Sequence, residues 1–201
     1  MAPQGSIFGI VGALSAFPRR LAAREVEGRG AQLRRGSTRG TSHVVFGRGL
    51  LASATAGALE TRVEAERRAG RQLLSENGFL RLLGLKRGPA AGELDEAAIC
   101  QQAKLSAQDL AMLGLFDCFE CAPPLYGFRD LILAKKYAGL IASGAGWFTV
   151  ARAIHRSGPV ASLTALSLLA DDKDEIYVRS RDGLSDLGGT AERDGVFGMH
   201  R

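Results

Sequence analysis

Short apolar runs alternate with amphipathic segments along the first third of the chain. The run at residues 7–11 is continuously apolar, which is typical of a strand that is covered on both faces of a parallel sheet, and residues 43–46 fit a second buried strand. Two weaker runs fit strands, and the segments between the runs carry apolar residues at helical spacing. Strands are predicted at residues 7–11, 31–34, 43–46 and 72–74, and helices at residues 18–27, 60–70 and 75–83.

The order of these elements predicts an α/β fold over residues 5–86. Strands that are connected through helices pair in parallel, with helices on both faces of the sheet. Pro18 suits the first turn of the first helix, and Ser75 is a favoured N-cap for the last. We therefore expect a small parallel four-stranded sheet with flanking helices.

The pattern changes after residues 87–92, where Gly88, Pro89 and Gly92 indicate a linker. Residues 93–157 show only helical patterns, so an all-α unit is predicted there. Its helices are expected at residues 94–103, 106–119, 128–143 and 147–155. Residues 158–201 are expected to be a partly disordered extension, with a short strand at 176–179 and an unstructured tail from Ser180.

Several short motifs of the first unit resemble a BRCT domain. They are Val11-Gly12 at the end of the first strand, Gly30, TSHVV at 41–45, and LLS at 73–75 followed by Phe79 and Leu80. The resemblance implies a module that binds a protein partner. Where such modules bind phosphopeptides, the family pattern assigns phosphate to a hydroxyl, a glycine amide and a basic residue. Here these positions hold Val11, Gly12, and Arg62 or Arg67, so Gly12, Arg62 and Arg67 are the candidate anion-binding residues.

The second unit is similar to the helix-turn-helix domain of the MerR family. The similarity is carried by YGFRDL at 126–131 and SGAGW at 143–147. It implies DNA binding, with residues 106–119 as the recognition helix, residues 121–127 as the wing, and a possible homodimer. The candidate DNA-binding residues are Arg129, Lys135, Lys136, Arg152 and Arg156.

The expected recognition helix departs from that family in its charge. It carries Asp109 and Asp117, Glu120 follows it, and it contains no Lys or Arg. Phosphate groups repel such a surface. A helix that packs or contacts protein is therefore an alternative to one that reads DNA.

Positive charge is concentrated in the first half of the chain. The 201 residues carry a net charge of +5, yet residues 1–88 hold fifteen Lys and Arg against six Asp and Glu. Such a surplus favours an anionic partner such as DNA, RNA or an acidic protein, although a solvated arginine-rich surface is the simpler interpretation for any one residue.

The sequence offers weak signs of enzyme, metal or cofactor chemistry. GRGLLA at 47–52 fits a variant dinucleotide-binding motif, but no apolar helix pattern follows it. Cys118 and Cys121 have a CxxC spacing without a second pair, and a structural role is expected for His43 and His155. The acidic run at 171–175 lacks the spacing of a calcium loop. We expect no enzyme activity, no metal and no cofactor.

Three cysteines suit a reduced protein better than a disulfide scaffold, and no apolar stretch approaches the length of a membrane span. We therefore expect a cytoplasmic protein that makes no membrane contact. Two functions remain open. One is a non-enzymatic, DNA-associated transcriptional regulator or adaptor that joins a BRCT-like interaction module to a MerR-like DNA-binding domain. The other is a protein-interaction scaffold in which neither unit binds DNA.

Overall fold

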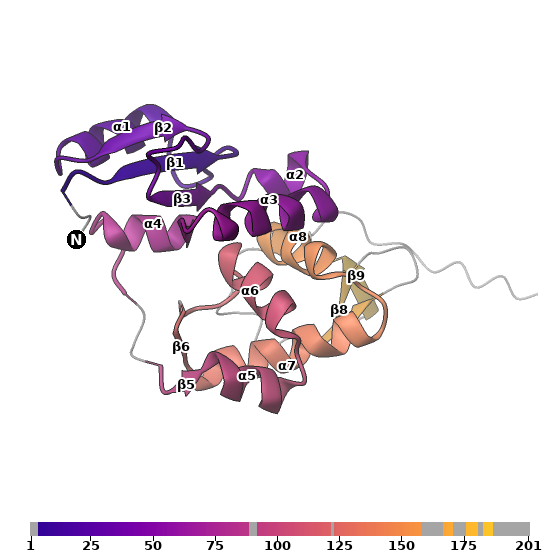
Figure 1. The fold of residues 1–201 in the computed structure, drawn as a ribbon. Helices are drawn as coiled ribbons and strands as arrows, with labels where there is room; N and C mark the ends of the chain where they lie inside the picture. The colour runs from indigo at the N-terminus through magenta and orange to yellow at the C-terminus, as the bar shows by residue number, and fades with distance from the viewer. Residues whose placement is uncertain are drawn as a thin grey trace, which may run out of the picture.

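The computed structural model describes residues 4–88, 92–121, 123–157, 167–170, 176–180 and 183–186. Its first unit is a sheet of four parallel strands in the order β2-β1-β3-β4. The strands are β1 (Ile7–Val11), β2 (Gln32–Arg35), β3 (His43–Phe46) and β4 (Gln72–Ser75). The predicted α/β fold with a parallel four-stranded sheet and flanking helices is confirmed (Figure 1).

Helices cover both faces of this sheet because its central strands are apolar on both sides. Strand β3 turns Val45 to one face, where α1 (Arg19–Glu27) and α4 (Glu76–Leu82) pack. It turns Val44 and Phe46 to the other face, where α2 (Leu50–Ser53) and α3 (Ala56–Arg68) pack. The continuous apolar runs of the sequence are thus explained by burial on two sides.

The second unit is built around four helices. They are α5 (Glu96–Ala103), α6 (Ala107–Leu115), α7 (Phe128–Ala142) and α8 (Trp147–Ser157). Ser106 caps α6 by accepting a hydrogen bond from the Asp109 amide at 3.0 Å, as its position before an apolar pattern predicts.

A two-residue strand precedes α5 in place of its predicted first turn. Strand β5 (Leu94–Asp95) pairs antiparallel with β6 (Leu125–Tyr126), within the segment expected to be the wing. Asp95 then caps α5 by accepting from the Ala98 amide at 2.7 Å. Because Leu94 pairs with Tyr126, the helix begins two residues later than predicted.

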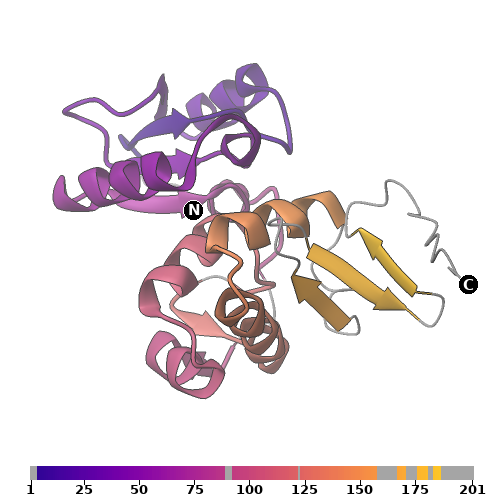
Figure 2. The same cartoon turned by 90° about the vertical axis from the view of Figure 1, so that its right-hand side faces the viewer.

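The two units share one apolar core. The edge of the Phe46 ring from β3 meets Phe116 at 6.5 Å between centroids, and Phe116 stacks on Trp147 of α8 at 5.8 Å. Leu50 and Leu51 of α2 belong to the same cluster as the buried residues of α6, α7 and α8. The helical unit therefore lies against the α2 and α3 side of the α/β unit, as both views show (Figures 1 and 2).

Three short strands follow the helical unit. They are β7 (Ser167–Ala170), β8 (Ile176–Ser180) and β9 (Gly183–Asp186), which form an antiparallel sheet in that order (Figure 2). The predicted strand at 176–179 is confirmed. The prediction of an unstructured tail from Ser180 is wrong for β9, whose pairing with β8 supplies order that its polar sequence does not signal. Residues 158–166, 171–175 and 187–201 lie outside the described residues, and with them the acidic run.

Within the described part of the chain, no helix combines the length and the apolar character that a membrane span requires.

Gly47 allows the segments that follow β1 and β3 to approach each other closely at the carboxyl ends of these strands. A Cβ atom at this position would lie 2.2 Å from the carbonyl oxygen of Ala13, whereas a Cβ atom at Gly57, in α3, would meet nothing within 4 Å. We predict that Gly47→Ala lowers the free energy of unfolding by about 1–3 kcal/mol, since the backbone must shift.

The matched Gly57→Ala variant is expected to raise the free energy of unfolding by about 0.5–1 kcal/mol, because alanine favours the helix. Urea denaturation measures both changes. Equal effects of the two substitutions would show that the segment around Ala13 does not pack against Gly47.

Candidate functional site

The carboxyl ends of the parallel strands meet at the junction with the helical unit. Open α/β sheets commonly bind ligands at this edge. Here β1 is followed by Gly12, β3 by Gly47 and Arg48, and β4 by Glu76. Asp117, from the end of α6, approaches the same place. They belong to a polar cluster around two buried carboxylates, which we call the junction cluster: Arg48, Glu76, Asn77, Asp117 and His155.

Glu76 fills the position that an anionic ligand would take in this cluster. Its side chain is fully buried and accepts hydrogen bonds from the Ala16 amide and, at 3.1 Å, from the Arg48 amide. The Arg48 guanidinium lies 3.3 Å from the same carboxylate. Burial alone would raise the pKa of Glu76, but the hydrogen bonds from Arg48 and from the Ser15, Arg48 and Ala16 amides outweigh it and lower the pKa.

Asp117 joins the junction cluster from the helical unit. Its backbone is left-handed, with φ at +57°, and its carboxylate accepts from the Asn77 amide at 3.0 Å. The Arg48 guanidinium lies 3.9 Å away, so one arginine is shared between carboxylates from the two units. Burial raises the pKa of Asp117 despite these contacts. The cluster thus ties the sheet to the end of α6.

His155 lies at the helical side of the cluster, and its ring is committed to a structural contact. Its Nε2 donates to the carbonyl of Phe116 at 2.5 Å, and burial lowers the pKa of the imidazole. His43, inside β3, is also buried; it stacks on Phe8 at 4.8 Å, and burial lowers its pKa too. Both histidines therefore have the structural roles that the sequence predicts.

The three candidate anion-binding residues do not converge. Gly12 has φ at +80°, and a Cβ atom there would lie 2.4 Å from the Leu50 side chain. Arg62 is held by Glu66 at 2.7 Å and by Ser37 at 2.8 Å, on the loop between β2 and β3. Arg67 is exposed and lines a groove next to α6. The structure places each residue against a different neighbour.

Glu66 explains why Arg62 is engaged, and the sequence analysis missed its role. This buried carboxylate accepts hydrogen bonds from Ser37 at 2.6 Å, from Arg62 and from Arg71. Burial would raise the pKa of Glu66, but these hydrogen bonds and the two arginine charges lower it. Its helical spacing of four from Arg62 is the one sequence signal that pointed to this pair.

The candidate DNA-binding residues lie on α7 and α8. Arg129 is exposed and pairs with Glu120 at 3.5 Å. Lys135 is exposed, whereas Lys136 is half-buried and burial lowers its pKa. Arg152 and Arg156 are exposed one turn apart, and the Arg152 guanidinium lies 5.7 Å from the centre of the Phe148 ring. These cations thus occupy two neighbouring helices.

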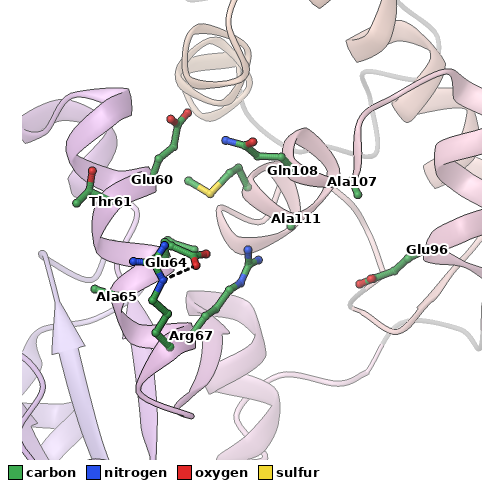
Figure 3. A pocket seen from close by; sticks show the side chains of 12 residues that line it. Glu60, Thr61, Glu64, Ala65, Arg67, Glu96, Ala107, Gln108 and Ala111 are labelled. Carbon is green, nitrogen blue, oxygen red and sulfur yellow. Dashed lines mark hydrogen bonds and ion pairs between the residues drawn. The ribbon is translucent and has the colours of Figure 1, made fainter.

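The expected recognition helix, α6, turns one face to the core and the other to a groove. Leu110, Met112, Leu113 and Leu115 are buried in the shared core. The other face, with Ala107, Gln108 and Ala111, lines a cavity of about 760 Å³ whose opposite wall is α3 (Figure 3). A helix enters the major groove of DNA only with one face accessible. In this structure α3 borders the face of α6 that lies outside the core.

The motifs considered for enzyme or metal chemistry have packing roles. Gly47 and Gly49 both approach Ala13 within 3 Å of an added Cβ atom, so the glycines of GRGLLA serve chain packing. Burial raises the pKa of the Cys118 thiol, and it raises the pKa of Cys121 to about 11. Among the described residues, no three His, Cys, Asp or Glu side chains gather as a metal site requires.

A second group of arginines, which the sequence did not indicate as a site, lies on α1 and β2. Arg19, Arg20 and Arg24 are exposed on α1, and Arg34 and Arg35 are exposed on the edge strand β2, which packs beside α1. We call these five residues the α1–β2 arginines. The first turn of α1 and the end of β2 lie at the same edge of the sheet, because the strands are parallel. Strand pairing therefore places β2 beside α1, with Arg34 and Arg35, as successive strand residues, on opposite faces of the sheet.

No family model matches this chain, and no curated protein sequence matches it significantly.

We predict that Glu76→Gln lowers the free energy of unfolding by about 3 kcal/mol, because it removes the buried charge that the Arg48 guanidinium and the Ala16 and Arg48 amides hold. The fold lowers the pKa of Glu76, so this contribution is present above about pH 4.3 and is lost as the pH falls. The matched Glu64→Gln removes an exposed pair with Arg68 and is expected to cost less than about 0.5 kcal/mol. Urea denaturation at pH 7 compares the variants, and similar losses would contradict the role of the junction cluster.

We also predict that stability falls between pH 7.5 and pH 5.5. Burial lowers the pKa of His43 and His155, so the unfolded chain takes up protons more readily than the folded one. Their contribution is complete above about pH 6.5 and is lost below it. His155→Gln keeps an N–H donor for the Phe116 carbonyl and should reduce this pH dependence. Identical pH dependence in His155→Gln and the unaltered chain would show that His155 accepts a proton in the fold.

Proposed function

We propose that this chain is a non-enzymatic, DNA-associated adaptor that contacts the phosphate backbone through the α1–β2 arginines and does not read bases through α6. The proposal rests on the observation that these arginines are exposed and form no ion pair with the described residues. Arginine is well suited to phosphate, which it meets with two parallel hydrogen bonds.

Internal pairing separates these arginines from the other cations of the same unit. Arg29 pairs with Glu25, Arg48 with Glu76, and Arg62 and Arg71 both with Glu66. A cation already bound to a carboxylate gains little from a phosphate, because the existing pair must first be broken. Among the described residues, the cations of this unit without an ion pair are the α1–β2 arginines, which lie on two adjacent elements, and Arg39, Arg67, Arg81, Lys86 and Arg87.

The position of α6 beside α3 supports DNA binding without base recognition. Base edges are read from within the grooves, whereas phosphate contacts carry no sequence information. The exposed side chains of α6 face α3, and none of them is a Lys or Arg. An adaptor that holds the DNA backbone fits this arrangement better than a regulator that selects a DNA site.

The interaction scaffold without DNA contact is the second candidate. It is favoured by the shared core, which makes the helical unit part of one body with the α/β unit, and by Asp109, Asp117 and Glu120 on and beside α6. The distinction between the two functions is whether the α1–β2 arginines meet DNA phosphates or an acidic protein.

The test is fluorescence anisotropy of a labelled duplex of mixed sequence, titrated with the full chain between 50 and 200 mM salt. We predict binding without sequence preference, with an affinity that falls steeply as salt rises. Replacing Arg19, Arg20 and Arg24 with alanine should make the salt slope shallower by about one for each phosphate that the variant no longer binds.

The matched control replaces Lys135, Arg152 and Arg156 with alanine, which removes the same charge from the helical unit. We expect a much smaller change in the salt slope, because these residues lie on α7 and α8, on the side of the sheet opposite to α1. Equal weakening by both variants would contradict the assignment to α1 and β2. No binding at 50 mM salt would favour the scaffold.

A further inference from the structure

A groove runs between the α/β unit and the helical unit. Helix α3 forms one wall, and α6 with the start of α5 forms the other (Figure 3). The groove consists of two adjoining cavities of about 760 and 520 Å³, and Arg67, Glu96 and Ala111 line both of them. Volumes of this size are typical of ligand sites in proteins.

Side-chain size on α6 keeps this groove open. The residues that α6 turns to the groove include Ala107, Ala111 and Gly114, which lie one turn apart along the helix. Their side chains are too short to reach α3. Contacts beside the groove hold α3 and α6 in place. Both helices contribute to the shared core, and Trp147 on α8 donates a hydrogen bond of 2.5 Å to Glu60 on α3.

Arg67 and Glu96, which have charges of opposite sign, line both cavities of the groove. Arg67 forms no ion pair with the described residues. Its neighbours do, because Arg68 pairs with Glu64 at 2.9 Å and Arg71 pairs with Glu66. The Arg67 side chain extends from α3 toward α6, and Glu96 lies across the groove from it (Figure 3). A ligand that meets both walls must carry an anionic group and a cationic group.

The second cavity adds main-chain groups along the edge strand β4. Gln72 of β4 donates its amide to Ser42 at the start of β3, at 2.9 Å. Successive residues of a strand turn their main-chain groups to opposite sides, so Leu73 directs its N–H and C=O away from β3. Leu73 lines the cavity at this edge. These groups suit the main chain of a peptide.

We propose that this groove binds an extended peptide segment of a protein partner, with an acidic side chain at Arg67 and a basic side chain at Glu96. A free phosphate fits poorly, because Glu60, Glu64 and Glu96 also line the first cavity and repel it. The peptide satisfies both charges and the edge of β4 together. The proposal is independent of DNA binding, since Arg67 and the α1–β2 arginines lie on different helices, which cover opposite faces of the sheet.

The experiment selects from a library of random heptapeptides on the immobilised full chain. The unaltered chain should enrich peptides with Asp or Glu at a constant spacing from Lys or Arg. Arg67→Glu should reverse the preference at the acidic position, and Arg67→Gln should abolish it. Arg24→Glu changes the charge equally on α1 and should select the same peptides as the unaltered chain.

Binding of the best selected peptide then tests the interaction directly. Exchanging its acidic residue for lysine should weaken binding to the unaltered chain by about tenfold or more, and Arg67→Glu should restore it. Circular dichroism confirms that each variant is folded. The proposal is overturned if the unaltered chain enriches no charge pattern, or if Arg67→Glu and the unaltered chain select the same peptides.

Discussion

The burial of one face of the sheet against the helical unit determines most of what this molecule presents to its surroundings. The Phe46 side chain of β3 points to the face covered by α2 and α3. There it contacts Phe116, which stacks on Trp147 of α8. Large aromatic side chains contribute strongly to stability when they are buried. The helical unit is therefore fixed against α3, and the face of α6 that remains outside the core is confined to the groove.

The charge of the molecule follows from the same packing. Buried carboxylates need hydrogen-bonding or charged partners, and here Glu66 holds Arg62 and Arg71 while Glu76 holds Arg48. The exposed arginines for which the described residues show no ion pair include those on α1 and β2 and Arg67 in the groove. An excess of basic residues in the sequence is thus divided into internal partners and surface cations, and only the second kind can bind a partner.

The periodicity of apolar residues predicted most helices and strands, but it could not predict which of them would pack or pair with one another. The strands at 7–11 and 43–46 agree with β1 and β3, because a short, mostly apolar run that ends at a glycine is typical of a buried strand. The shared core could not be predicted, since Phe46 and Phe116 are seventy positions apart. For the same reason Arg62 was assigned to phosphate and Glu66 was overlooked. The β9 strand depends on β8 for its order, and no local pattern marks it.

Trp147 is the only tryptophan of the chain and lies in the contact between the units, so its fluorescence reports on the shared core. The most direct measurement is urea unfolding followed both by this fluorescence and by far-ultraviolet circular dichroism. If the two units depend on one core, both signals change in a single transition with the same midpoint. A fluorescence change that is complete before most of the helix and strand signal disappears would contradict the shared core.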